Sequence, residues 1–190
     1  MAAEGVKVRG VLVTLEFKYL IQFMVNAFIR PSDLRVLRHE HVQVMSNPKA
    51  KKAGDRKFLL LKHPATKTTD QEVVTMPAAH GIYQNLKAMQ EMRGFGAPKE
   101  LVFFPEYENR NTMIAVAGRI FSAGVKRAGL QQDGEKHTLY SLRHTAIMYR
   151  LLYGENVSTL ELARNARTSQ AMIDKHYASR LTPLMAVDSI

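Results

Sequence analysis

Two arginines, a lysine and a tyrosine are the residues of this sequence whose types and order could do chemistry. They are Arg30, Lys67, Arg143 and Tyr177, and each is expected where the backbone presents its side chain rather than buries it. Guanidiniums are permanently charged, forked donors that suit the oxygens of a phosphate. A tyrosine hydroxyl is a possible nucleophile. The set indicates a phosphate-handling site with a tyrosine nucleophile.

The elements that must position these residues follow from the hydrophobic pattern. Apolar residues recur at helical spacing over 15–28, and Pro31 begins a second helix, which leaves Arg30 at an elbow. Asp33 falls in the first turn of that helix, where we expect it to buttress the elbow. Strands are expected at 41–45, 57–61 and 72–76, and further helices at 79–92, 112–128, 142–152, 158–165 and 170–176.

The predicted fold class is mainly α with a small three-stranded antiparallel sheet. Ser141 is the expected N-cap of the helix that carries Arg143, so this arginine should lie near a helix N-terminus. Lys67 should project from the tip of the hairpin between the second and third strands, with Lys62 as the alternative inward lysine. Residues 1–14 alternate weakly, so a strand and an irregular lead-in both remain open.

The charge balance favours a polyanionic partner. The chain has 27 basic and 17 acidic residues, a net charge of +10 and a pI near 9.9. No long apolar run or amphipathic basic anchor accompanies this charge, so nucleic acid is favoured over a membrane. A basic interaction protein that needs no nucleic acid remains an alternative. The basic residues are densest in one segment, which supplies the candidate DNA contacts Lys49, Lys51, Lys52, Arg56 and Lys57.

Composition also narrows the class of protein. A chain of 190 residues with 46% hydrophobic residues fits one globular domain with a real core. The absence of cysteine removes disulfides and a thiol nucleophile. Apolar stretches are short and interrupted by charge, so we expect no membrane span and a cytoplasmic protein, nucleoid-associated if bacterial. His39 and His41 have no third ligand nearby in the sequence, so no metal is expected.

Three motifs around the four residues resemble the catalytic domain of the tyrosine recombinase (phage integrase) family. Lys67 in addition fits the lysine of that family's second hairpin turn. The motifs resemble, in order, the first arginine box, the second arginine box and the nucleophile box: Arg30-Pro-Ser-Asp33-Leu34 with Leu37-Arg-His-Glu-His-Val42, Tyr140-Ser-Leu-Arg143-His144-Thr145, and Leu162-Ala-Arg-Asn-Ala-Arg-Thr168-Ser169 with His176-Tyr177. The resemblance covers nearly the whole chain.

The resemblance implies a site-specific recombinase or integrase of a phage or mobile element. Arg30 and Arg143 would stabilise the phosphate, Tyr177 would form a 3′-phosphotyrosyl link, and Lys67 would protonate the leaving 5′ oxygen. The implied partners are double-stranded DNA and further copies of the chain on DNA, and no metal or cofactor is required. The implied division is a lead-in at 1–14, the catalytic domain at 15–180 and a tail at 181–190, which would dock on a neighbouring copy or on its own domain.

Two positions depart from the family pattern. Tyr140 stands where histidine or lysine is usual, and Thr168 stands where histidine or tryptophan is usual, with Arg167 in place of the usual glycine. Both hydroxyls can hydrogen-bond to a phosphate, but neither is a near-neutral acid or base. A catalytically weakened DNA-binding module of the same fold is therefore the alternative function. His144 is expected to pack or to bond to the backbone, with a supporting role left open.

Overall fold

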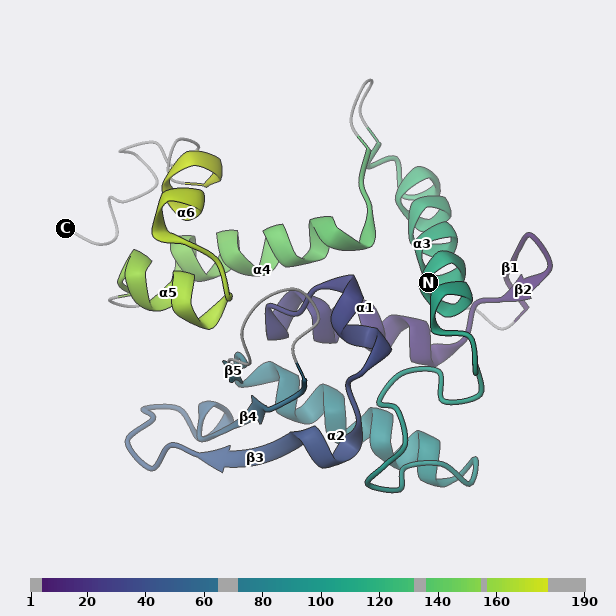
Figure 1. The fold of residues 1–190 in the computed structure, drawn as a ribbon, viewed down its shortest axis with the longest axis horizontal. Helices are drawn as coiled ribbons and strands as arrows, with labels where there is room; N and C mark the ends of the chain where they lie inside the picture. The colour runs from purple at the N-terminus through teal and green to yellow at the C-terminus, as the bar shows by residue number, and fades with distance from the viewer. Residues whose placement is uncertain (1–4, 65–71, 132–135, 155–156, 178–190) are drawn as a thin grey trace.

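The computed structural model describes residues 5–64, 72–131, 136–154 and 157–177, and helix α1 (Leu15–Ala27) lies at its centre. Leu20, Phe23 and Met24 on α1 are fully buried. One side of α1 packs on α2 (Ala78–Glu91), and another packs on α4 (Leu139–Tyr153). Figure 1 shows the result, with α4 on one side of α1 and the sheet and α2 on the other. The helix predicted at 15–28 is confirmed.

The three strands predicted from alternation form one antiparallel sheet in the order β3-β4-β5. Strand β3 (Val42–Ser46) pairs with β4 (Lys57–Leu61), which pairs with β5 (Val73–Val74). Leu59 and Leu61 of β4 are fully buried, as alternation on a one-sided sheet requires. Strand β3 is largely exposed along its length. The predicted fold class is confirmed.

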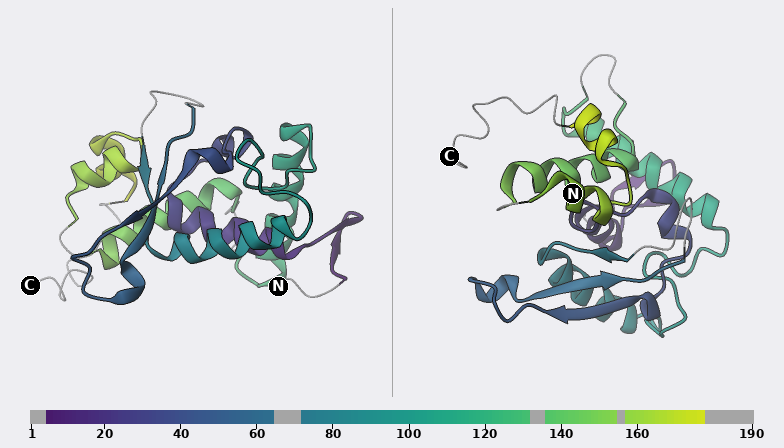
Figure 2. Two further views of the ribbon diagram at one scale, coloured as in Figure 1. Left: turned by 90° about the horizontal axis from the view of Figure 1, so that it is seen from below. Right: turned by 60° about the vertical axis from the view of Figure 1, so that its left-hand side comes forward.

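The remaining helices frame the two ends of α4. Helix α3 (Arg110–Arg127) stands at one end, and the short pair α5 (Thr159–Asn165) and α6 (Gln170–His176) stands at the other (Figures 1 and 2). In the described part of the chain, short 3-10 segments connect the elements: η1 (Pro31–Arg35), η2 (His39–His41) and η3 (Ala53–Asp55). All five helices predicted after the sheet region are present. The helix predicted at Pro31 is instead the single 3-10 segment η1.

The N-terminal segment, which the sequence left open, forms a small hairpin. Strand β1 (Lys7–Val8) pairs with β2 (Val11–Leu12), and the turn between them has positive φ at Arg9 and Gly10. Lys7 and Val8 join residues of α1 and α3 in lining an apolar pocket. The alternation of residues 1–14 therefore reflects strand structure within the described part of this segment.

The start of helix α4 shows that the predicted position of Arg143 near a helix N-terminus is wrong. The N-cap is Thr138, not Ser141, and Ser141 instead accepts a 3.0 Å bond from the Thr138 amide within a capping box. Arg143 is consequently the fifth residue of α4, beyond the turn whose amides are free. The expected help from a helix N-terminus does not apply to it.

Within the described ranges, no helix is long and apolar enough to cross a bilayer. The same residues contain no group of three or more histidine, aspartate or glutamate side chains arranged to hold a metal ion.

Candidate active site

Arg30 is held at the elbow that the sequence predicted. Its backbone N–H donates to the Asp33 carboxylate at 2.7 Å, which fixes the turn after Phe28 and Ile29. Asp33 is fully buried and Arg30 is half-buried, so the carboxylate buttresses the elbow as expected. The Arg30 guanidinium donates from Nη2 to the carbonyl of Arg167, at the turn between α5 and α6. The first arginine is therefore aimed at the segment that leads to Tyr177.

Arg143 is a buried residue, contrary to the expectation that the backbone presents it. Its guanidinium donates from Nη1 to the Phe28 carbonyl and from Nη2 to the Ala166 carbonyl. Burial lowers the pKa of Arg143 to about 10, and the nearby positive charge of Arg30 adds to the effect. Arg30 and Arg143 thus bind two consecutive carbonyls of the α5–α6 turn and lie close to each other.

Arg167 is a third guanidinium beside these two, and like Arg143 it is buried. It pairs through Nη2 with the Asp33 carboxylate, and its Nη1 lies 3.2 Å from His63 Nε2. His63 is also buried, and its Nδ1 lies 2.8 Å from the Pro64 carbonyl. Burial, above all, lowers the pKa of His63, which favours the neutral ring with its proton on Nδ1. We call Arg30, Arg143 and Arg167 with Asp33 and His63 the arginine cluster.

The arginine cluster carries an excess of positive charge in a mostly buried place. Its members are three guanidiniums, one carboxylate and one imidazole whose lowered pKa keeps it neutral near pH 7. The net charge of the cluster is therefore +2. Burying like charges together costs free energy unless an anion compensates them. A bound anion would compensate this excess charge.

Tyr177 is the C-cap of α6, and its side chain is buried, which again differs from the expected exposure. Its hydroxyl bonds to Nδ1 of His144, whose ring packs against it at a centroid distance of 5.4 Å. The His144 ring also meets the Tyr140 ring edge-on at 5.0 Å. Tyr140 in turn lies within electrostatic range of Arg143. His144 and Tyr140 therefore link the tyrosine to the arginine cluster.

The fold is shared with two solved structures. One is the Tn1549 transposon integrase in complex with transposon right end DNA, with a TM-score of 0.57 and 15% identity over 95% of this chain and 60% of that one. The other is XerA recombinase, with a TM-score of 0.55 and 16% identity over 98% of this chain and 65% of that one. The chain has the tyrosine recombinase catalytic-domain fold. It spans less than two thirds of either recombinase, and no protein-family model or curated protein matches its sequence.

The remaining predicted site residues are Thr168 and the two candidate lysines. Thr168 is half-buried directly after Arg167, and its N–H donates to the Ala163 carbonyl at 2.9 Å. Lys67 lies outside the described residues. Lys62, the alternative lysine, forms a 2.7 Å ion pair with Glu72 at the surface, so its ammonium already has an acidic partner.

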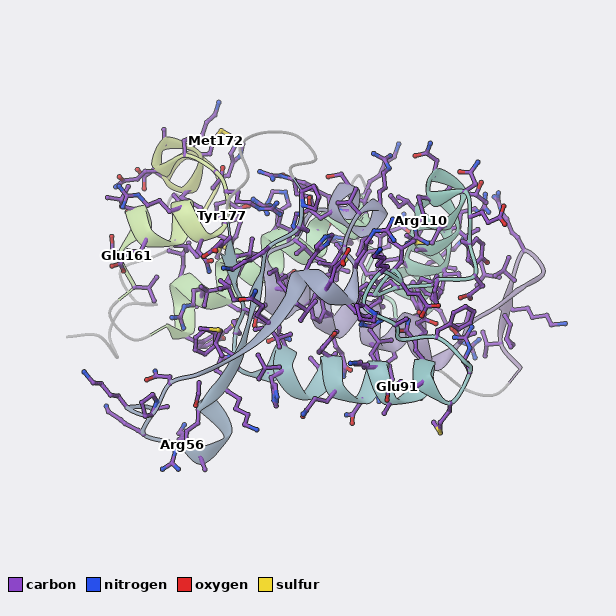
Figure 3. The ribbon with its side chains drawn as sticks, turned by 60° about the horizontal axis from the view of Figure 1, so that its bottom comes forward. Arg56, Glu91, Arg110, Glu161, Met172 and Tyr177 are labelled. Atoms are coloured by element: carbon purple, nitrogen blue, oxygen red, sulfur yellow. The ribbon has the colours of Figure 1, made fainter. Side chains whose placement is uncertain are left out.

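The basic segment of residues 49–57 lies apart from Tyr177. Lys49, Lys51, Lys52 and Arg56 occupy the exposed connection between β3 and β4, and Lys57 begins β4. In Figure 3, Arg56 lies at the outer end of this hairpin, well away from Tyr177. The structure therefore separates a peripheral cationic surface from the buried arginine cluster.

Two residues of the site were not assigned a role from the sequence. Arg167 stands where the resembled family usually has glycine, and its backbone φ of 51° is the left-handed conformation for which glycine is favoured. For His144 the sequence is compatible with packing and with a supporting role. The spacing from Tyr140 to His144 is one helical turn, which places both rings on one face and is the signal that could have found this contact.

Proposed function

We propose that this chain is the catalytic part of a site-specific DNA recombinase that cleaves and rejoins DNA through a 3′-phosphotyrosyl intermediate. The observation that carries the proposal is the arginine cluster with its net charge of +2, in a recombinase fold, beside the helix that ends at Tyr177. A phosphodiester is the anion that fits forked guanidinium donors.

Each residue has a distinct part in the proposed reaction. Arg30 and Arg143 stabilise the charge that develops on the non-bridging oxygens. Arg143 is already held by two carbonyls, so its direction is set before DNA binds. The Tyr177 hydroxyl attacks phosphorus and forms the covalent link, which keeps the bond energy for rejoining. Lys67 is the proposed general acid for the 5′ oxygen, and the pairing of Lys62 with Glu72 supports that choice.

Double-stranded DNA is the proposed partner. The Tn1549 integrase, which shares the fold, was solved on transposon end DNA, and this chain has a net charge of +10. The exposed basic segment of 49–57 would hold the DNA backbone outside the arginine cluster. Several copies are proposed to assemble on DNA through the tail. Deleting residues 182–190 and finding the same number of copies bound to DNA would contradict that part.

A catalytically weakened DNA-binding module is the second candidate function. The observation in its favour is that Tyr140 and Thr168 stand at positions where the resembled family usually has an ionisable or indole donor. Such a module would bind the same DNA and leave no covalent product.

Covalent capture on a pool of random sequences separates the two candidates. The protein is incubated with duplexes that carry randomised sequence and one nick, so that cleavage near the nick releases a short strand and traps the adduct. Protein-linked DNA is then recovered under denaturing conditions and sequenced. The recombinase should enrich one sequence, and Tyr177→Phe should recover none. Sequence-selective binding without any adduct would establish the binding module instead.

A further inference from the structure

The nucleophile's hydroxyl already has a partner in the structure, and it is an imidazole. Tyr177 bonds through its hydroxyl to Nδ1 of His144. The two rings are tilted by 36° with centroids 5.4 Å apart, a contact that holds the hydroxyl against this nitrogen. A phenol is a weak nucleophile until its proton is removed, so the group at this oxygen matters for the reaction.

The position of His144 follows from the helix that carries the second arginine. Tyr140 and His144 are four residues apart on α4, so they lie on one face, and their rings meet edge-on at 72°. Arg143 precedes His144 and points to the buried side, toward the Phe28 and Ala166 carbonyls. One helical turn therefore sends a guanidinium into the arginine cluster and an imidazole to the tyrosine.

We propose that His144 is the proton acceptor for Tyr177 in the strand-cleavage step, an inference that rests on the proposed recombinase function. With its own proton on Nε2, the neutral imidazole takes the hydroxyl proton at Nδ1. The phenolate oxygen forms the bond to phosphorus as the bond from phosphorus to the 5′ oxygen breaks. The 5′ oxygen takes a proton from the general acid. In rejoining, the 5′ hydroxyl returns its proton to the general acid and attacks phosphorus, the phosphotyrosyl bond breaks, and His144 returns the proton to the tyrosine oxygen.

The surroundings of His144 suit this role. The imidazole is exposed, so it can exchange protons with solvent, whereas Tyr177 is buried with 6% of its surface exposed. The pocket beside the pair is lined by Lys136 before α4, by Ser141, Thr145, Met148 and Tyr149 on α4, and by His137 and His176. The Tyr140 ring meets the His144 ring edge-on, with the ring centroids 5.0 Å apart.

His144→Asn is the decisive variant, because its side-chain amide retains a hydrogen-bond partner near the Nδ1 position but cannot accept a proton. We expect its rate of adduct formation on the captured sequence to fall by about 10²–10⁴ at pH 7, the usual value of a positioned proton acceptor. The deficit should shrink as the pH rises toward the range in which a phenol ionises by itself, about pH 10. His144→Ala should regain part of its rate when imidazole is added, since the position is open to solvent.

The controls distinguish this inference from the proposed function. His176→Asn removes another exposed imidazole of the same pocket and should leave the rate unchanged. His144→Asn should be slowed as much on a substrate with sulfur at the leaving 5′ position as on the ordinary substrate. Sulfur leaves without a proton, but the tyrosine must still lose its own proton. A His144→Asn rate within about threefold of the wild type, with no imidazole rescue of His144→Ala, would overturn the inference, because a proton acceptor is worth at least ~10². A wild-type protein that forms no adduct would overturn the proposed function as well.

Discussion

The ion pair between Asp33 and Arg167 should be the most destabilising contact of the site to break. Its side chains are 0% and 3% exposed, so the carboxylate left behind by Arg167→Met would remain in a dry environment. Removing one partner of a buried pair typically costs about 3–5 kcal/mol. Methionine fills most of the volume, and the left-handed backbone at residue 167 is equally strained with either side chain. We therefore expect the free energy of unfolding to fall by about 3–5 kcal/mol.

Urea unfolding measures this loss directly. With a slope of about 2 kcal/mol per molar, a loss of about 3–5 kcal/mol lowers the urea midpoint by about 1.5–2.5 M. The double variant Asp33→Asn with Arg167→Met removes both charges, and it should be more stable than the sum of the single effects predicts. The midpoints of the wild type, the two single variants and the double variant together give the coupling energy between the two side chains.

A surface pair of the same chain provides the matched control. Lys62 and Glu72 are 2.7 Å apart, but their side chains are 43% and 55% exposed. Lys62→Met should cost no more than about 1 kcal/mol, since solvent screens an exposed pair. If Arg167→Met costs as little as Lys62→Met, the reasoning that the arginine cluster is buried and charge-coupled is refuted.

The remaining predictions concern pH, salt and the general acid. Burial lowers the folded-state pKa of His63, so the unfolded chain binds more protons at this residue. Its contribution to stability is therefore present above about pH 6.5 and is lost as the pH falls through the lower folded value. His63→Gln retains an acceptor for Arg167, and its urea midpoint should fall less steeply between pH 7 and 5 than that of the wild type. The logarithm of the affinity for duplex DNA should fall against the logarithm of the salt concentration with a slope of about −0.9 per phosphate neutralised. Replacing Lys51 and Lys52 by alanine should reduce the magnitude of that slope by up to about 2. An unchanged slope would mean that the DNA binds elsewhere. Lys67→Ala should slow cleavage by about 10²–10⁴ yet cleave a 5′-sulfur substrate almost normally, whereas Arg143→Ala should stay slow on both; equal impairment of Lys67→Ala on the sulfur substrate would contradict its assignment as the acid.

Local patterns predicted much of the fold that this chain shares with the two recombinases. Periodicity over a short window predicts the helix at 15–28, the three strands and the five later helices. The Arg30 elbow was also local, since Pro31 restricts the residue before it and Asp33 bonds back over three positions. The N-cap of α4 is Thr138, three residues before the predicted Ser141, because both residues are suitable caps and the capping box uses both of them.

The sequence by itself determined the elements, the excess of positive charge and the order of the arginines and the tyrosine. Only the tertiary structure decided which side chains meet. Arg167 pairs with Asp33 across 134 positions, and Tyr177 meets His144 across 33. The burial of Arg143 depends on carbonyls of Phe28 and Ala166, which no local pattern brings together. Periodicity encodes which face of an element is apolar, whereas the partner of a buried polar group depends on how separate elements pack, and that packing is set by the whole chain.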